Sequence, residues 1–151
     1  MPQRLLRRLF LPSVLVVTTS FVLALVSVSD STPSLLYFAF AVFHGYLAPA
    51  VLLLLAALAL LVAVHERRWS WALVLTAVAA FLLALPFLHY LVLGYNRTPL
   101  AVQLQQWPFF WYATVGYSLW YGSGFVALFV IWRFLRSQGQ HRPVEARHVT
   151  A

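Results

Sequence analysis

Residues 35–64 read LLYFAFAVFHGYLAPAVLLLLAALALLVAV and contain no formally charged side chain. A transmembrane helix needs about 20 mainly apolar residues to cross a hydrocarbon core that is ~30 Å thick. Because this stretch is longer than that, we expect a membrane-spanning helix that tilts, kinks or projects from the bilayer. Pro49 can supply a kink, since proline lacks the backbone N–H that an internal helical hydrogen bond requires.

Three more apolar stretches accompany this one. The charged residues of the 151-residue chain lie at its ends and in the gaps between the stretches, and only 9% of the residues are charged while 63% are hydrophobic. That balance is far from the balance of a soluble domain. We expect spans at about residues 9–28, 35–64, 71–93 and 108–131, an amphipathic surface segment at 94–107, and a tail at 137–151. The sequence therefore predicts an all-α protein, a single transmembrane domain folded as a four-helix bundle.

The distribution of arginine predicts the orientation of this bundle. All ten basic residues are arginine, and only Arg97, between the third and fourth spans, falls on the side opposite to the other nine. Since basic segments stay in the cytoplasm, we expect both termini to be cytoplasmic, in the inner membrane of a prokaryote. The net charge of +7 also favours contact with anionic lipids. We do not expect nucleic acid as a partner, because no known binding module is recognisable.

Two histidines are the candidate functional residues. His44 and His89 are the only side chains within the spans that titrate near neutral pH. An ionisable group inside a membrane is costly without a partner, which makes such a group a functional candidate. Counted along two antiparallel helices, the two residues lie at similar depths in the outer leaflet. We expect them to ligate the metal of a tetrapyrrole, singly or together, and Gly45 lets a flat ring approach the backbone.

Aromatic residues crowd the same leaflet. Phe40 precedes His44 by about one helical turn, and Tyr90 follows the second histidine. Trp120 and Tyr121 lie deeper in the fourth span than an interfacial aromatic belt requires. A wall of rings suits a haem b, a chlorophyll or bacteriochlorophyll, a carotenoid or a quinone head-group. The alternative interpretation is an ordinary aromatic belt, in which each histidine only hydrogen-bonds a neighbouring helix.

The fourth span is also rich in small residues. Residues spaced by four lie on one face of a helix, and small side chains there let another helix approach closely. The helix-packing candidates are Gly116, Ser118, Gly122, Ser123 and Ala127. A second surface of this kind, on the second span, is formed by Ala56, Ala59 and Ala63. We expect these faces to pack either within the chain or against larger membrane subunits.

Several function classes have no candidate residues. The sequence has no cysteine, no carboxylate within a span, and no HExxH, GxSxG or phosphate-loop motif, so we expect no independent catalytic activity. With histidines in its spans, the chain resembles the small haem-carrying membrane subunits of respiratory enzymes, which implies a haem and larger partner subunits. The expected function is that of a small subunit of an electron-transfer or light-driven complex, in respiration or photosynthesis. The alternative is a cofactor-free structural or assembly subunit that packs against larger subunits, lipids or carotenoid.

Overall fold

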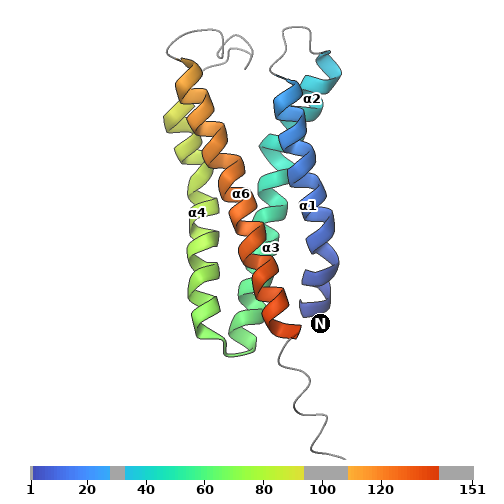
Figure 1. The fold of residues 1–151 in the computed structure, drawn as a ribbon, viewed down its shortest axis with the longest axis vertical. Helices are drawn as coiled ribbons and strands as arrows, with labels where there is room; N and C mark the ends of the chain where they lie inside the picture. Colours follow the sequence, from blue (N-terminus) through green and yellow to red (C-terminus); the bar gives the residue numbers. More distant parts are fainter. Residues whose placement is uncertain (1, 28–32, 94–108, 140–151) are drawn as a thin grey trace, which may run out of the picture.

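The computed structural model describes residues 2–27, 33–93 and 109–139, with side chains described for 2–27, 33–87 and 115–138. Its elements are α1 (Pro2–Val26), α2 (Ser34–Val42), the π-helical turn η1 (Phe43–Leu47), α3 (Ala48–His65), α4 (Trp69–Leu93) and α6 (Phe109–Gly139). Because α2, η1 and α3 follow one another without a break, the described residues form four long rods (Figure 1). Each rod contains a segment that is long and apolar enough to cross a membrane, so the prediction of an all-helical protein with four candidate spans is confirmed.

The helices extend beyond two of the expected ends. α1 begins at Pro2, so the three N-terminal arginines lie on its first turns rather than before it. α6 continues to Gly139, which makes the beginning of the expected tail helical. The rest of that tail, at 140–151, and the expected surface segment at 94–107 lie outside the described residues.

The long second span changes its helical form near its middle. In η1 the N–H of Ala48 bonds to the carbonyl of Phe43, five residues earlier, which is the pattern of a π-helix. Pro49 accounts for this turn, because it offers no N–H to the carbonyl four residues earlier and its ring would clash with that carbonyl. A wider π turn avoids the clash, and such turns within α-helices are frequent at functional sites. The turn that Pro49 imposes carries His44.

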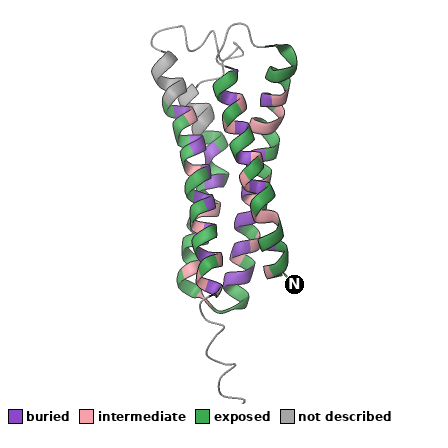
Figure 2. Cartoon of the chain, turned by 45° about the vertical axis from the view of Figure 1, so that its right-hand side comes forward, coloured by how far each residue is buried: buried purple, intermediate pink, exposed green. Residues whose placement is uncertain are grey.

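Small residues line the places where the rods meet, and buried positions follow one face of each rod (Figure 2). The buried residues of α1 recur at intervals of three and four over most of the helix, as in Ser13, Val17, Ser20 and Ala24. The alanine face of α3, formed by Ala56, Ala59 and Ala63, is 0% exposed. That face therefore packs within this chain, and it does not provide the second partner surface that the sequence suggested.

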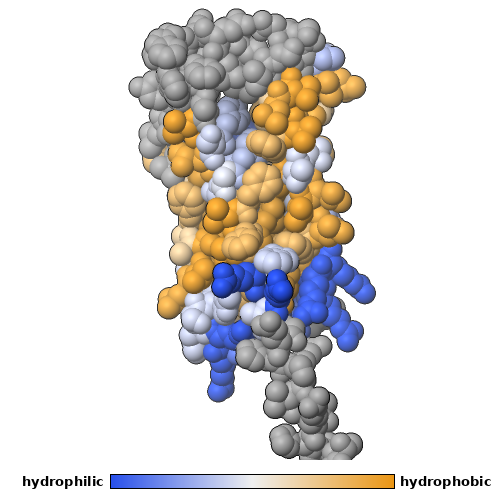
Figure 3. Space-filling view, viewed as in Figure 1, coloured by the Kyte–Doolittle hydropathy of each residue, from blue (hydrophilic) through white to orange (hydrophobic). Residues whose placement is uncertain are grey.

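Polar side chains fasten three helices together at one end of the bundle. Gln3 Nε2 donates to Glu66 Oε1 at 2.8 Å and to Gln138 Oε1 at 3.0 Å. Gln138 Nε2 donates to Glu66 Oε2 at 3.1 Å. These bonds join the start of α1, the residue after α3 and the end of α6, where hydrophilic side chains gather below the apolar body (Figure 3). The first described helix, α1, therefore starts at the end of the bundle where the last one, α6, finishes. We call this end, which holds Gln3, Glu66 and Gln138, the arginine end.

The turn between α3 and α4 lies at the same end and is closed by a Schellman motif. Arg67 N–H donates to Val64 O at 3.0 Å, and Arg68 N–H donates to Ala63 O at 2.8 Å. Arg67 takes the left-handed position with φ 56°, which glycine usually occupies because it has no Cβ. The tight turn makes α3 and α4 antiparallel neighbours, as the short gap between the second and third spans implies.

Candidate functional site

His44 reaches from η1 toward the two helices at either end of the chain. Its Nδ1 atom lies 3.0 Å from the hydroxyl oxygen of Tyr121 on α6. That hydroxyl donates to the backbone carbonyl of Ser20 on α1 at 3.0 Å, and the Ser20 Oγ atom also lies 3.0 Å from it. Three rods therefore meet at the phenol oxygen of Tyr121, whose side chain is 5% exposed.

The donors in this cluster follow from the number of available protons. The Ser20 carbonyl can only accept, so we assign the single hydroxyl proton of Tyr121 to that carbonyl. The Tyr121 oxygen then accepts from the Nδ1–H of His44 and from the Ser20 hydroxyl. With a proton on Nδ1, a neutral imidazole carries its lone pair on Nε2. Nε2 is thus the atom of His44 that has the electron pair needed to coordinate a metal or accept a hydrogen bond.

Aromatic rings surround the imidazole. The Phe40 ring stacks on it with centroids 5.1 Å apart and an interplanar angle of 21°. The Trp120 ring meets it edge-on at 5.3 Å, while Tyr117 and Tyr121 lie at 5.3 and 5.6 Å. Phe40 and Trp120 are both buried. We call the group of His44, Phe40, Tyr117, Trp120, Tyr121 and Ser20 the His44 site.

The structure brings some of the predicted cofactor-binding residues together. Phe40 and Trp120 contact His44 as described, and Gly45 lies beside it with no atom within 4 Å of the position that a Cβ would take. His89 and Tyr90 lie on α4, but their side chains fall outside the described ones. The pairing of the two histidines therefore stays a prediction.

Sequence reasoning did not find the part that Ser20 plays. Serines occur at positions 13 and 20 of α1 and at position 27 just after its end, and all three are buried. The hydroxyls at 13 and 27 bond to carbonyls of α1 itself, whereas Ser20 meets a side chain of another helix. Because a hydroxyl in an apolar medium requires a partner, the regular spacing of these serines was a usable signal for an inward polar face.

The small residues of α6 divide between the inside and the outside of the bundle. Gly116 and Ala127 are buried, Ser123 is half-buried and donates to the Trp120 carbonyl, and Ser118 and Gly122 are exposed. A Cβ added at Gly122 would meet no atom within 4 Å, whereas one added at Gly124 would lie 3.3 Å from the Leu52 side chain. Gly124, which was not among the predicted packing residues, therefore makes the close approach between α6 and α3.

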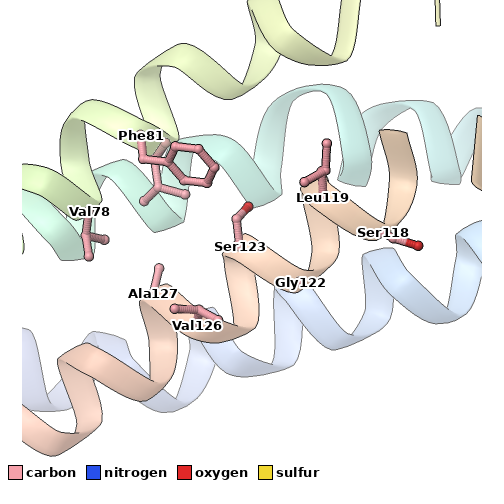
Figure 4. A pocket seen from close by; sticks show the side chains of 9 residues that line it. Val78, Phe81, Ser118, Leu119, Gly122, Ser123, Val126 and Ala127 are labelled. Carbon is pink, nitrogen blue, oxygen red and sulfur yellow. The ribbon is translucent and has the colours of Figure 1, made fainter. Parts of the chain in front are cut away.

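Residues of α6 line a pocket of about 270 Å³ that they share with α4 (Figure 4). From α4 the lining consists of Val78, Phe81 and Leu82. From α6 it consists of Ser118, Leu119, Gly122, Ser123, Val126 and Ala127. Four of the five predicted helix-packing residues thus border this apolar pocket.

Comparison of the chain with protein-family models, with curated proteins and with solved structures found no match.

Proposed function

We propose that this chain is a small transmembrane subunit of an electron-transfer or light-driven complex, and that it binds a tetrapyrrole through Nε2 of His44. The hydrogen bond between His44 Nδ1 and the buried Tyr121 oxygen is the observation that carries this proposal. A metal-ligating histidine almost always donates its other ring N–H to a fixed acceptor, which sets the tautomer and the orientation of the ring. Tyr121 is such an acceptor, and Ser20 holds it in place.

The chemistry of the surrounding residues fits a flat macrocycle. Phe40 and Trp120 pack apolar rings against the imidazole, and Gly45, the next residue in η1, adds no side chain to the turn. A haem needs axial ligands from the protein, and its iron is commonly held by histidine. When bound, a haem b would supply one-electron transfer, and a chlorophyll-type pigment would supply light absorption. In this proposal His89 is the second ligand, and larger membrane subunits are the electron or excitation partners.

A cofactor-free structural subunit is the second candidate function. The hydrogen bonds that fix His44 also tie η1, α1 and α6 together within the membrane, which is a structural role in itself. In this alternative the aromatic residues pack against lipids, carotenoid or a neighbouring subunit, and Tyr121 serves only to join helices.

The absorbance of the full-length chain, purified from its native membrane in mild detergent, separates the two functions. We expect a Soret band that is lost in His44→Ala and retained in Tyr46→Phe. Tyr46 is a suitable control because it lies on the same π turn but is 75% exposed. A wild-type spectrum with protein aromatic bands alone would overturn the tetrapyrrole proposal. Carotenoid bands without a Soret band, or a co-purifying quinone, would overturn it in favour of those ligands.

We also propose that the arginine end of the bundle faces the cytoplasm of a prokaryotic cell. The chain has no cysteine, so single cysteines can report the two sides without background labelling. In intact cells from which any outer membrane and cell wall have been removed, a membrane-impermeant maleimide should label Thr98→Cys. It should label Pro2→Cys only after permeabilisation, because basic segments stay inside. The reverse pattern would invert the bundle and place His44 in the cytoplasmic leaflet.

A further inference from the structure

A second pocket lies between α4 and α6, nearer to the arginine end. Its volume is about 480 Å³, and its lining is Trp71, Phe129, Trp132, Arg133, Arg136 and Ser137. This pocket combines cations with tryptophan, the residue that favours the boundary between the hydrocarbon and the head-groups. It therefore has the composition of a site at the membrane surface rather than of a packing defect within the bilayer.

The two arginines of this pocket suit a phosphate group. Arg133 and Arg136 are three residues apart, so they are neighbours on one helix face, and both are exposed. The guanidinium carbon of Arg136 lies 5.5 Å from the Trp132 ring centroid, a cation–π contact that restricts its position. Among the described residues that line the pocket there is no carboxylate to compete for these cations. Planar guanidinium groups match phosphate oxygens in geometry as well as charge.

The two pockets lie one after the other along the α4–α6 boundary, and we call them together the α4–α6 groove. On α6, the residues that line them recur at intervals of four, three, four and three: Gly122, Val126, Phe129, Arg133 and Arg136. On α4 the same boundary is followed by Trp71, Val78 and Leu82. Residues at such intervals share one face of a helix. The polar pocket and the apolar pocket that Figure 4 shows therefore lie in line on the same face of α6.

The groove is longer than one lipid leaflet, but its apolar pocket begins within the leaflet next to the arginines. At ~1.5 Å of helical rise per residue, Val126 lies ~10 Å and Ser118 ~22 Å from Arg133 along the α6 axis. One leaflet contributes about half of the ~30 Å hydrocarbon core, or ~15 Å. An acyl chain that starts beside the arginines would therefore reach the apolar pocket within its own leaflet.

We propose that this groove is a specific binding site for one anionic phospholipid. Its phosphate lies between Arg133 and Arg136, its glycerol region lies against Trp71 and Trp132, and one acyl chain fills the apolar pocket beside Gly122. This proposal does not depend on a cofactor at the His44 site, because the two sites share no residue.

Lipid titrations of the full-length chain, delipidated in an uncharged detergent, test the charged half of the site. We expect phosphatidylglycerol to bind more tightly than phosphatidylcholine with the same acyl chains. Arg133→Gln combined with Arg136→Gln should weaken phosphatidylglycerol binding by about tenfold or more, since each basic residue near a membrane surface contributes roughly 1 kcal/mol. The matched control, Arg4→Gln with Arg7→Gln, removes the same charge from the same end but outside the groove. Equal losses in both double variants would overturn the site and leave a diffuse charge effect.

Two further measurements test whether the acyl chain occupies the apolar pocket and whether a free anion alone can occupy the charged one. Gly122→Phe should place a ring in the apolar pocket and weaken phosphatidylglycerol binding, while the unfolding transition remains because a Cβ at this position meets no atom within 4 Å. Unchanged lipid affinity in this variant would overturn the placement of the acyl chain. Inorganic phosphate should not displace the lipid at millimolar concentration, and displacement would instead identify a site for a free anion.

Discussion

Replacing Gly124 by leucine is expected to lower the free energy of unfolding of this chain by about 3 kcal/mol, because overpacking a tight interior typically costs 1–3 kcal/mol and sometimes more. A Cβ at Gly124 would already lie 3.3 Å from Leu52 Cδ1 and 3.7 Å from Val17 Cγ1. Three further carbon atoms have no space unless α6 moves away from α1 and α3. Unfolding of the purified chain in mixed micelles, followed by the fluorescence of its six tryptophans, measures the effect.

Gly122→Leu is the matched control, since it makes the same chemical change two residues away. The side chain would point into open space, and leucine favours a helix over glycine by up to about 1 kcal/mol. We therefore expect this variant to be as stable as the wild type or slightly more stable. Equal destabilisation by both substitutions would contradict the orientation of α6. A stable Gly122→Leu chain that no longer co-purifies with its native partners would show that a protein helix, rather than a lipid chain, covers the groove.

Gly122 and Gly124 also show which features of the fold could not be predicted from the sequence. The existence of four spans could be predicted because the thickness of the bilayer fixes the length of an apolar helix. Which face of a span turns inward is a different question, because a span in contact with both lipid and protein is apolar all round. The alanines at 56, 59 and 63 and the small residues of α6 looked equivalent in the sequence. Only the packing of the rods shows that the alanines are buried and that Gly122 is exposed.

Some contacts of the His44 site could likewise be predicted from the sequence, and others could not. The contact between Phe40 and His44 could be predicted from a spacing of one helical turn. The bonds that join Tyr121 to Ser20 could not, because these residues lie 101 positions apart and meet only after the first and last spans have packed together. The π turn adds a second obstacle, since an extra residue in a turn rotates the side chains that follow it.

Tyr121→Phe is expected to lower the free energy of unfolding by about 1–2 kcal/mol. The substitution keeps the ring but leaves the Nδ1–H of His44 and the hydroxyl of Ser20 without their shared acceptor. A buried polar group that loses its partner costs about 1–3 kcal/mol, and hydrogen bonds between helices in membranes contribute about 0.6–1.7 kcal/mol. The loss should depend on His44, so a double-mutant cycle with His44→Phe should give a coupling energy of about 1 kcal/mol. Tyr46→Phe, which removes an exposed hydroxyl, should leave stability unchanged.

The same substitution should also act on the proposed cofactor. Loss of the hydrogen-bond partner of a ligating histidine typically weakens metal affinity about 10–100-fold, because the ring is no longer held in one tautomer and orientation. We therefore expect Tyr121→Phe to retain less tetrapyrrole than the wild type after the same purification, with a weaker or shifted Soret band. A coupling energy near zero would show that His44 and Tyr121 do not share a hydrogen bond. Measurable coupling together with an unchanged Soret band would show that the bond only joins helices and that Tyr121 does not position a metal ligand.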